Sequence, residues 1–184
     1  MSEIEFFLIL IAIVLGLAVA KLLEGIYAVS ESSQRYWVHT LWLANKLGQC
    51  ILFFWSLRDD AVAGQFTQIE GSFQFVILMI VGPILFFLQA LVLVGLSPTS
   101  ESNWAIHFYK GRRRFFALNI LALIVVGLSA ILGTSATLFL PFGVLFALSI
   151  LGFVSDNRTI HGVIACTATA TVVVGVGQIV ITIS

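Results

Sequence analysis

The distribution of charged residues limits what this chain can fold into. No Asp, Glu, Lys or Arg occurs in five long segments, which are Phe6–Ala20, Tyr36–Asn45, Gly71–Ser100, Phe115–Ser155 and Thr159–Ser184. Of all residues, 10% are charged and 60% are hydrophobic, whereas a soluble domain has about 25% charged residues. This composition excludes a soluble globular domain, a disordered chain and an electrostatic nucleic-acid binder. The pattern predicts an integral membrane protein.

The lengths of the uncharged segments predict how many helices cross the membrane. A helix needs about 20 apolar residues to cross the hydrocarbon core, which is about 30 Å thick. The segment Phe115–Ser155 is too long for one crossing and has turn-forming residues at 133–135, so it predicts two helices. Gly82 and Pro83 predict a kink in the third helix. We therefore predict an all-α, polytopic bundle of six transmembrane helices near residues 4–29, 36–57, 73–97, 112–133, 137–154 and 159–183.

The Lys and Arg residues between these helices predict the orientation of the chain. Cytoplasmic loops are enriched in Lys and Arg. One side of the predicted bundle has only Arg58, and the other has Arg35, Lys110, Arg112, Arg113, Arg114 and Arg158. This places both termini outside, in the plasma or inner membrane, with a single transmembrane domain over 1–184 and no soluble domain. We expect the first helix to be retained, because Glu3 and Glu5 stand where a signal peptide has basic residues.

Charged residues inside the predicted helices are candidates for function. Lys46 lies about 15 Å along its helix from Tyr36, where a charge costs at least about 3 kcal/mol. His39, Lys46 and Gln49 share one face of that helix, and the short connection to the first helix makes the two helices neighbours. The sequence therefore predicts a polar network that faces the bundle interior, formed by Lys21, Glu24, His39, Lys46 and Gln49. For Lys21 and Glu24, an ion pair near the helix end is the alternative.

The last predicted helix has a second polar face. It contains Thr167, Thr171, Gly175, Gln178 and Thr182 at spacings of three and four residues. One interpretation is a pore-lining stripe of hydroxyl and amide groups. The other is tight helix packing, because small residues and threonines are typical of helix interfaces in membranes.

The segment 100–111 predicts an amphipathic helix in the membrane interface, with Trp104, Phe108 and Tyr109 on its apolar side. Four cations occur at its end, and each is expected to bind anionic lipid headgroups with about 1 kcal/mol. These are Lys110, Arg112, Arg113 and Arg114. The arginines are also explained by topology alone, since cytoplasmic loops are basic.

No catalytic, metal-binding or cofactor-binding motif is present, and the two cysteines, Cys50 and Cys166, lie in apolar segments. We therefore predict neither an enzyme nor a metal or cofactor site. Two functions are consistent with a charge near the middle of the membrane. One is a channel or transporter, and a 20.1 kDa bundle favours a homo-oligomer because it has little room for its own pore. The alternative is a non-transporting scaffold or accessory subunit, with a protein partner in the membrane or the cytoplasm.

Overall fold

The computed structural model of the chain is all-α. It describes residues 3–62, 64, 77–96, 103–132 and 139–183. Within these ranges there are six α-helices and no strands, which confirms the predicted helix number and class. The helices are α1 (Glu3–Glu31), α2 (Trp37–Val62), α4 (Gly82–Val94), α5 (Trp104–Leu132), α6 (Phe139–Val154) and α7 (Arg158–Ile183), and a short π-helix, η2 (Ile77–Val81), precedes α4.

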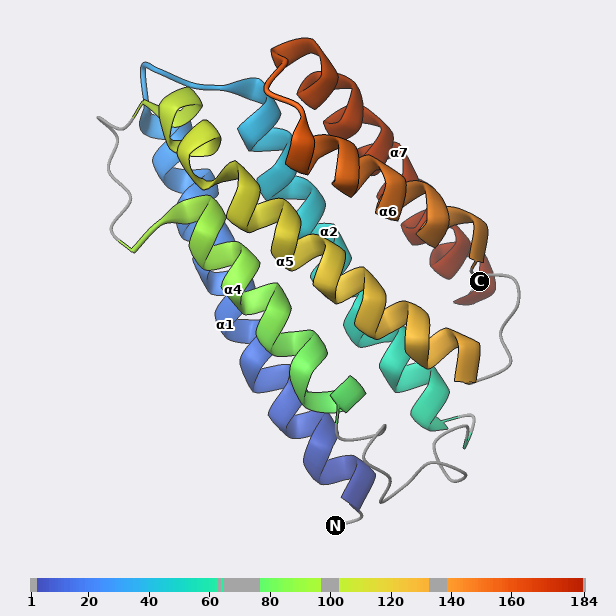
Figure 1. Ribbon diagram of the computed structural model, residues 1–184. Coiled ribbons are helices and arrows are strands. Elements are labelled where there is room, and N and C mark those ends of the chain that lie inside the picture. Colours follow the sequence, from blue (N-terminus) through green and yellow to red (C-terminus); the bar gives the residue numbers. More distant parts are fainter. Residues whose placement is uncertain (1–2, 63, 65–76, 97–102, 133–138, 184) are drawn as a thin grey trace.

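The helices form two layers of three, with α1, α2 and α7 behind α4, α5 and α6 in Figure 1. Helix α1 packs on α2 and α4, α5 packs on α4 and α6, and α7 packs on α2 and α6. The central helices of the two layers are therefore α2 and α5. One end of the bundle, which we call the basic end, holds the last turn of α1 and the first turns of α2, α5 and α7 (Figure 1). Both chain termini lie toward the opposite end.

Large aromatic side chains fill the interior between α2 and α5. Trp42 of α2 contacts Phe115 and Phe116 of α5 edge to face, with ring centroids 5.0 and 5.4 Å apart. All three side chains are buried. Edge-to-face contacts of this kind are favoured by the charge distribution of aromatic rings. The two central helices are thus held together through side chains.

The neighbouring helices within and between the layers approach closely at glycines. A side chain at Gly25 would collide with Val94, one at Gly48 with Val172, and one at Gly152 with the ring of Phe116. These contacts join α1 to α4, α2 to α7, and α6 to α5. Small residues at helix crossings are characteristic of helix association in membranes, where close packing replaces the hydrophobic effect.

Helix α5 differs from the sequence prediction, because it begins at Trp104 and continues without interruption past Arg112. The part of the predicted interfacial segment from residue 104 onward is therefore the first part of α5, and residues 100–102 lie outside the described ranges. Trp104 and Phe108 are buried rather than directed at lipid. The reason is that Trp104 stacks on His39 and Phe108 contacts Tyr36, so the aromatic face packs on the start of α2.

Helix α4 starts at the predicted kink site, Gly82 and Pro83. Pro83 has no N–H to bond the carbonyl four residues earlier, and the chain forms the wider π-helical turn η2 directly before Gly82. Gly82 also lets Phe53 of α2 approach. At the predicted kink site, a π-helix therefore changes to an α-helix. The predicted turn at 133–135 lies outside the described residues.

The outer surface of α1 is apolar over most of its length. Phe6, Ile9, Ile13, Leu17 and Leu23 are each more than half exposed. Among the described residues, one helix, Ile4–Glu31, is long and apolar enough to cross a membrane by length and composition. Shorter apolar helices cover Met79–Val94, Gly143–Val154 and Arg158–Val174.

Candidate functional site

Lys46 lies between the two layers of the bundle. It projects from the middle of α2, and its side chain is 2% exposed. The Nζ atom donates hydrogen bonds to Oδ1 of Asn119 on α5, at 2.5 Å, and to Oε1 of Gln49 on α2, at 2.7 Å. The side-chain amine therefore links the two central helices.

The hydrogen bonds of Lys46 extend into a chain that crosses three helices. Gln49 Nε2 donates to Asn45 Oδ1 at 2.6 Å, and Asn119 Nδ2 donates to Ser149 Oγ on α6 at 2.7 Å. The Ser149 hydroxyl donates in turn to the carbonyl of Leu145, at 2.6 Å. We call Asn45, Lys46, Gln49, Asn119 and Ser149 the Lys46 chain. It runs from α2 through α5 to α6.

No carboxylate among the described residues pairs with Lys46. Its other near neighbours are the rings of Phe86 and Phe115, whose centroids lie 5.3 and 5.6 Å from Nζ. Amide oxygens and aromatic faces provide partial negative charge but no full counter-charge. The Lys46 amine therefore lies among amide oxygens and aromatic rings, without a carboxylate partner among the described residues. Chemically, such a group can receive an anion or exchange a proton.

The structure places Lys21 and Glu24 away from Lys46. Lys21 Nζ pairs with Glu24 at 2.7 Å and donates to the carbonyl of Leu96, just beyond α4, at 3.3 Å. The Glu24 side chain is 49% exposed. A cation near the last carbonyls of a helix interacts favourably with the helix dipole. Lys21 and Glu24 thus form a local ion pair where α1 meets the end of α4, which is the alternative stated from the sequence.

His39 belongs to an aromatic cluster at the basic end. Its ring stacks on Trp104 at 5.0 Å and lies 5.8 Å from the ring of His107. The side chain is fully buried, and neither ring nitrogen has a hydrogen-bond partner in the described structure. The five residues predicted as one network therefore form three groups. Lys21 and Glu24 pair on α1, His39 packs on Trp104 at the basic end, and Lys46 bonds Gln49 in the middle of α2.

The other two histidines bond to backbone. His107 Nε2 donates to the carbonyl of Leu93 at 2.8 Å, and His161 Nε2 donates to that of Ser155 at 2.9 Å. His161 also stacks on Phe116. Among the described residues, no group of three or more His, Cys, Asp or Glu side chains is placed to hold a metal ion.

The polar face of α7 uses its hydroxyls within the helix. Thr167 donates to the carbonyl of Val163 and Thr171 to that of Thr167, both at 3.0 Å. The face toward α2 carries buried small residues, and Gly162 contacts Trp37. The described part of α7 that faces α2 therefore packs closely against it. For Gly175, Gln178 and Thr182, the other three residues of the predicted stripe, the structure describes only the helical backbone.

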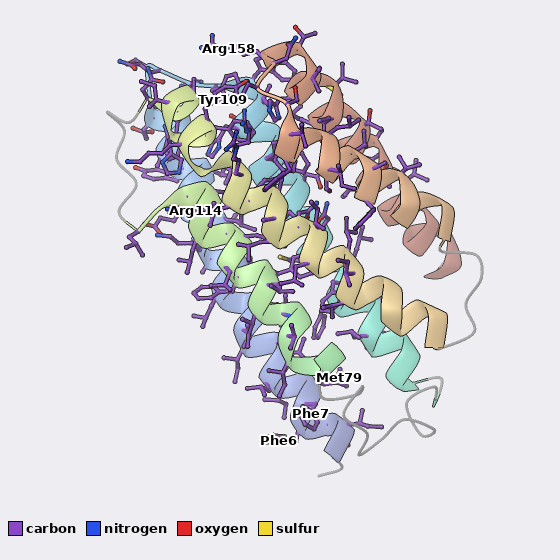
Figure 2. All side chains as sticks on the ribbon, viewed as in Figure 1. Phe6, Phe7, Met79, Tyr109, Arg114 and Arg158 are labelled. Atoms are coloured by element: carbon purple, nitrogen blue, oxygen red, sulfur yellow. The ribbon has the colours of Figure 1, made fainter. Side chains whose placement is uncertain are left out.

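The four predicted headgroup-binding cations have different positions. Arg112 points inward, with its side chain 3% exposed, and pairs with Asp156 in the connection between α6 and α7. Figure 2 shows Tyr109 and Arg158 at this basic end, opposite to Phe6 and Phe7. Lys110 and Arg114 line a cavity beside α4, and Arg113 is exposed. Consecutive residues point about 100° apart on a helix, so three adjacent arginines cannot face one ligand.

Two described cavities are not lined by any residue of the Lys46 chain. One, of about 250 Å³, lies between α1 and α2 and is lined by Cys50 and apolar side chains. The other, of about 420 Å³, lies between α4 and α5.

Comparison of this chain with known proteins finds no family model, no curated protein and no solved structure that matches it.

Proposed function

We propose that this chain is a multi-pass protein of the cell membrane that transports a small solute past Lys46, with all six helices in the bilayer. The membrane position is supported by the outer face of α1, where Ile9, Ile13 and Leu17 are each more than half exposed. A continuous exposed apolar surface of this kind is unfavourable in water. The positions of Lys and Arg support an orientation with the basic end in the cytoplasm and both termini outside.

The observation that carries the transport proposal is the position of Lys46. Its ammonium lies between the two central helices, bonded to Asn119 and Gln49 and without a carboxylate among the described residues. Ionisable groups inside a membrane protein are costly and are typically part of a solute or proton pathway. A cation without a carboxylate partner among the described residues favours a small anion as the transported solute.

The path past Lys46 is filled in this structure. Trp42, Phe115 and Phe116 occupy the interior between α2 and α5. Transport therefore requires either a rearrangement of the two layers or an assembly of several copies. We retain the homo-oligomer in the proposal because the bundle alone has little free interior volume.

The test is anion flux into liposomes that contain the purified protein. We expect chloride or another small anion to enter with wild-type protein, and Lys46→Met to reduce the rate at least about tenfold, a change that corresponds to about 1.4 kcal/mol. Lys46→Arg, which retains the charge, should keep part of the flux. Arg113→Gln is the matched control and should leave it unchanged. Absence of flux with wild-type protein, or equal flux with Lys46→Met, would contradict transport.

A second function, an accessory subunit without transport activity, is favoured by one observation. The Lys46 chain is hydrogen-bonded from Asn45 to the carbonyl of Leu145, and neither described cavity reaches it. A chain of this kind also serves to fix helix positions. The accessory function predicts no flux from the purified protein under any condition, and flux only when a stoichiometric membrane partner is reconstituted with it.

A further inference from the structure

We propose that the cavity between α4 and α5 binds the anionic headgroup and upper acyl chain of one phospholipid. The cavity has a volume of about 420 Å³, which lies within the range of small-molecule sites. We call it the α4–α5 groove and define it by Leu88, Leu91 and Val92 on α4 and by Lys110, Arg114 and Leu118 on α5. The inference depends on the membrane position proposed above but not on transport.

The groove changes from charged to apolar along the bundle axis. Lys110, Arg114 and Leu118 are four residues apart and therefore lie on one face of α5. Because α5 starts at the basic end, the two cations lie nearer that end, and Leu118 lies about 12 Å deeper than Lys110 along the helix. On α4, which runs toward the basic end, Leu88 is likewise deeper than Leu91. A phospholipid has the same order, with its phosphate at the membrane surface and its chains below.

The two cations are available to a ligand. Both are exposed, and within the described residues neither forms a hydrogen bond or an ion pair with the protein. No Asp or Glu lines the groove. Its histidine, His107, already donates to the carbonyl of Leu93. Arg114 lines the groove, and Figure 2 shows it beside the C-terminal half of α4.

The apolar wall identifies the ligand as a lipid instead of a soluble anion. Leu88, Leu91, Val92 and Leu118 form most of the deeper surface, and a free phosphate would leave that surface uncovered. Leu88 is partly exposed on the outer side of the bundle, so a chain can enter from the surrounding lipid. Gly111 contributes by keeping α5 close to the backbone of Val92, which closes the floor of the groove between the two helices.

The experiment measures lipid binding to the purified protein in neutral detergent by native mass spectrometry. The ligands are phosphatidylglycerol, phosphatidylcholine with the same chains, and glycerol phosphate. We expect wild-type protein to bind one phosphatidylglycerol. Arg113→Gln should bind it with equal affinity, because Arg113, contrary to the expectation from sequence, does not line the groove. Each of Lys110→Gln and Arg114→Gln should weaken it about fivefold, and the double variant about 30-fold. Phosphatidylcholine should bind at least tenfold more weakly, and glycerol phosphate should not bind.

Three results would overturn the proposal. These are equal phosphatidylglycerol binding by the double variant, equal binding of phosphatidylcholine, and binding of glycerol phosphate as tight as that of the lipid. Leu88→Trp provides an independent test, because it fills the apolar part of the groove while both cations remain. It should reduce phosphatidylglycerol binding about tenfold, and unchanged binding would also contradict the site. A protein that fails to enter membranes at all would instead contradict the proposed function, which carbonate extraction of membranes reveals separately.

Discussion

The polar partners of Lys46 are the side-chain amides of Gln49 and Asn119, and this determines how the site responds to substitution. Removing one partner of a buried hydrogen bond leaves the other unsatisfied, at a cost of about 1–3 kcal/mol. Replacing both partners by apolar groups of similar shape is often nearly neutral. Lys46 and Asn119, which are both buried and 2.5 Å apart at their bonded atoms, form such a pair.

We therefore predict a strong coupling between Lys46→Met and Asn119→Leu. Each single substitution should lower the free energy of unfolding in mixed micelles by about 2 kcal/mol, because Lys46→Met leaves Oδ1 of Asn119 without its donor and Asn119→Leu removes one of the two acceptors of Lys46 Nζ. The double variant should lose less than the sum, with a coupling energy of about 1–2 kcal/mol. Additive effects within about 0.5 kcal/mol would show that the two side chains do not interact.

Of the residues in the Lys46 chain, the sequence pointed to Lys46 and Gln49 but not to Asn45, Asn119 or Ser149. Lys46 is conspicuous because a charge inside an apolar segment is costly wherever it faces. The partners of Lys46 depend on how α2, α5 and α6 are rotated about their axes, which no single segment specifies. A signal was present, since Asn119 is the only amide side chain between Phe115 and Ser155, and polar side chains in membrane helices bond across helix interfaces.

At the scale of the elements, Gly152 is a point where α6 approaches α5 closely. Gly152→Val should destabilise the protein by about 1–3 kcal/mol, because the new side chain would overlap the ring of Phe116. Gly143→Val on the same helix is the matched control, since no atom lies within 4 Å of a side chain placed there. Thermal unfolding in detergent measures both. Equal shifts of the midpoint would contradict a specific contact at Gly152.

The helices themselves were largely predictable from uncharged segments. The segment predicted at 159–183 is α7, Arg158–Ile183, and the one predicted at 4–29 is α1, Glu3–Glu31. The start of α5 was not predicted, because Lys110 and the three arginines interrupt the apolar pattern on which the prediction was based. A helical backbone tolerates charged residues where their side chains reach water or a partner such as Asp156.

At the scale of the whole molecule, the orientation has a direct test. In a variant with Cys50→Ser and Cys166→Ser, a single cysteine is introduced at Ser33, in the connection between α1 and α2, or at Arg58, near the end of α2. A membrane-impermeant maleimide should label Arg58→Cys in intact cells and Ser33→Cys only after the membrane is opened. The reverse pattern would invert the orientation, and labelling of both in intact cells would contradict a membrane-spanning bundle.

The apolar outer face of α1 also determines how stability varies with temperature. In a bilayer, exposed side chains such as Ile9 and Leu17 have apolar neighbours whether the helices are associated or separated. The heat capacity of unfolding comes mainly from apolar surface newly exposed to water, at about 0.45 cal/K/mol per Å². Separation of the helices within the membrane exposes little of that surface, so its heat-capacity change should be small. The stability of the bundle should then decrease almost linearly with temperature, without the weakening on cooling that soluble domains show.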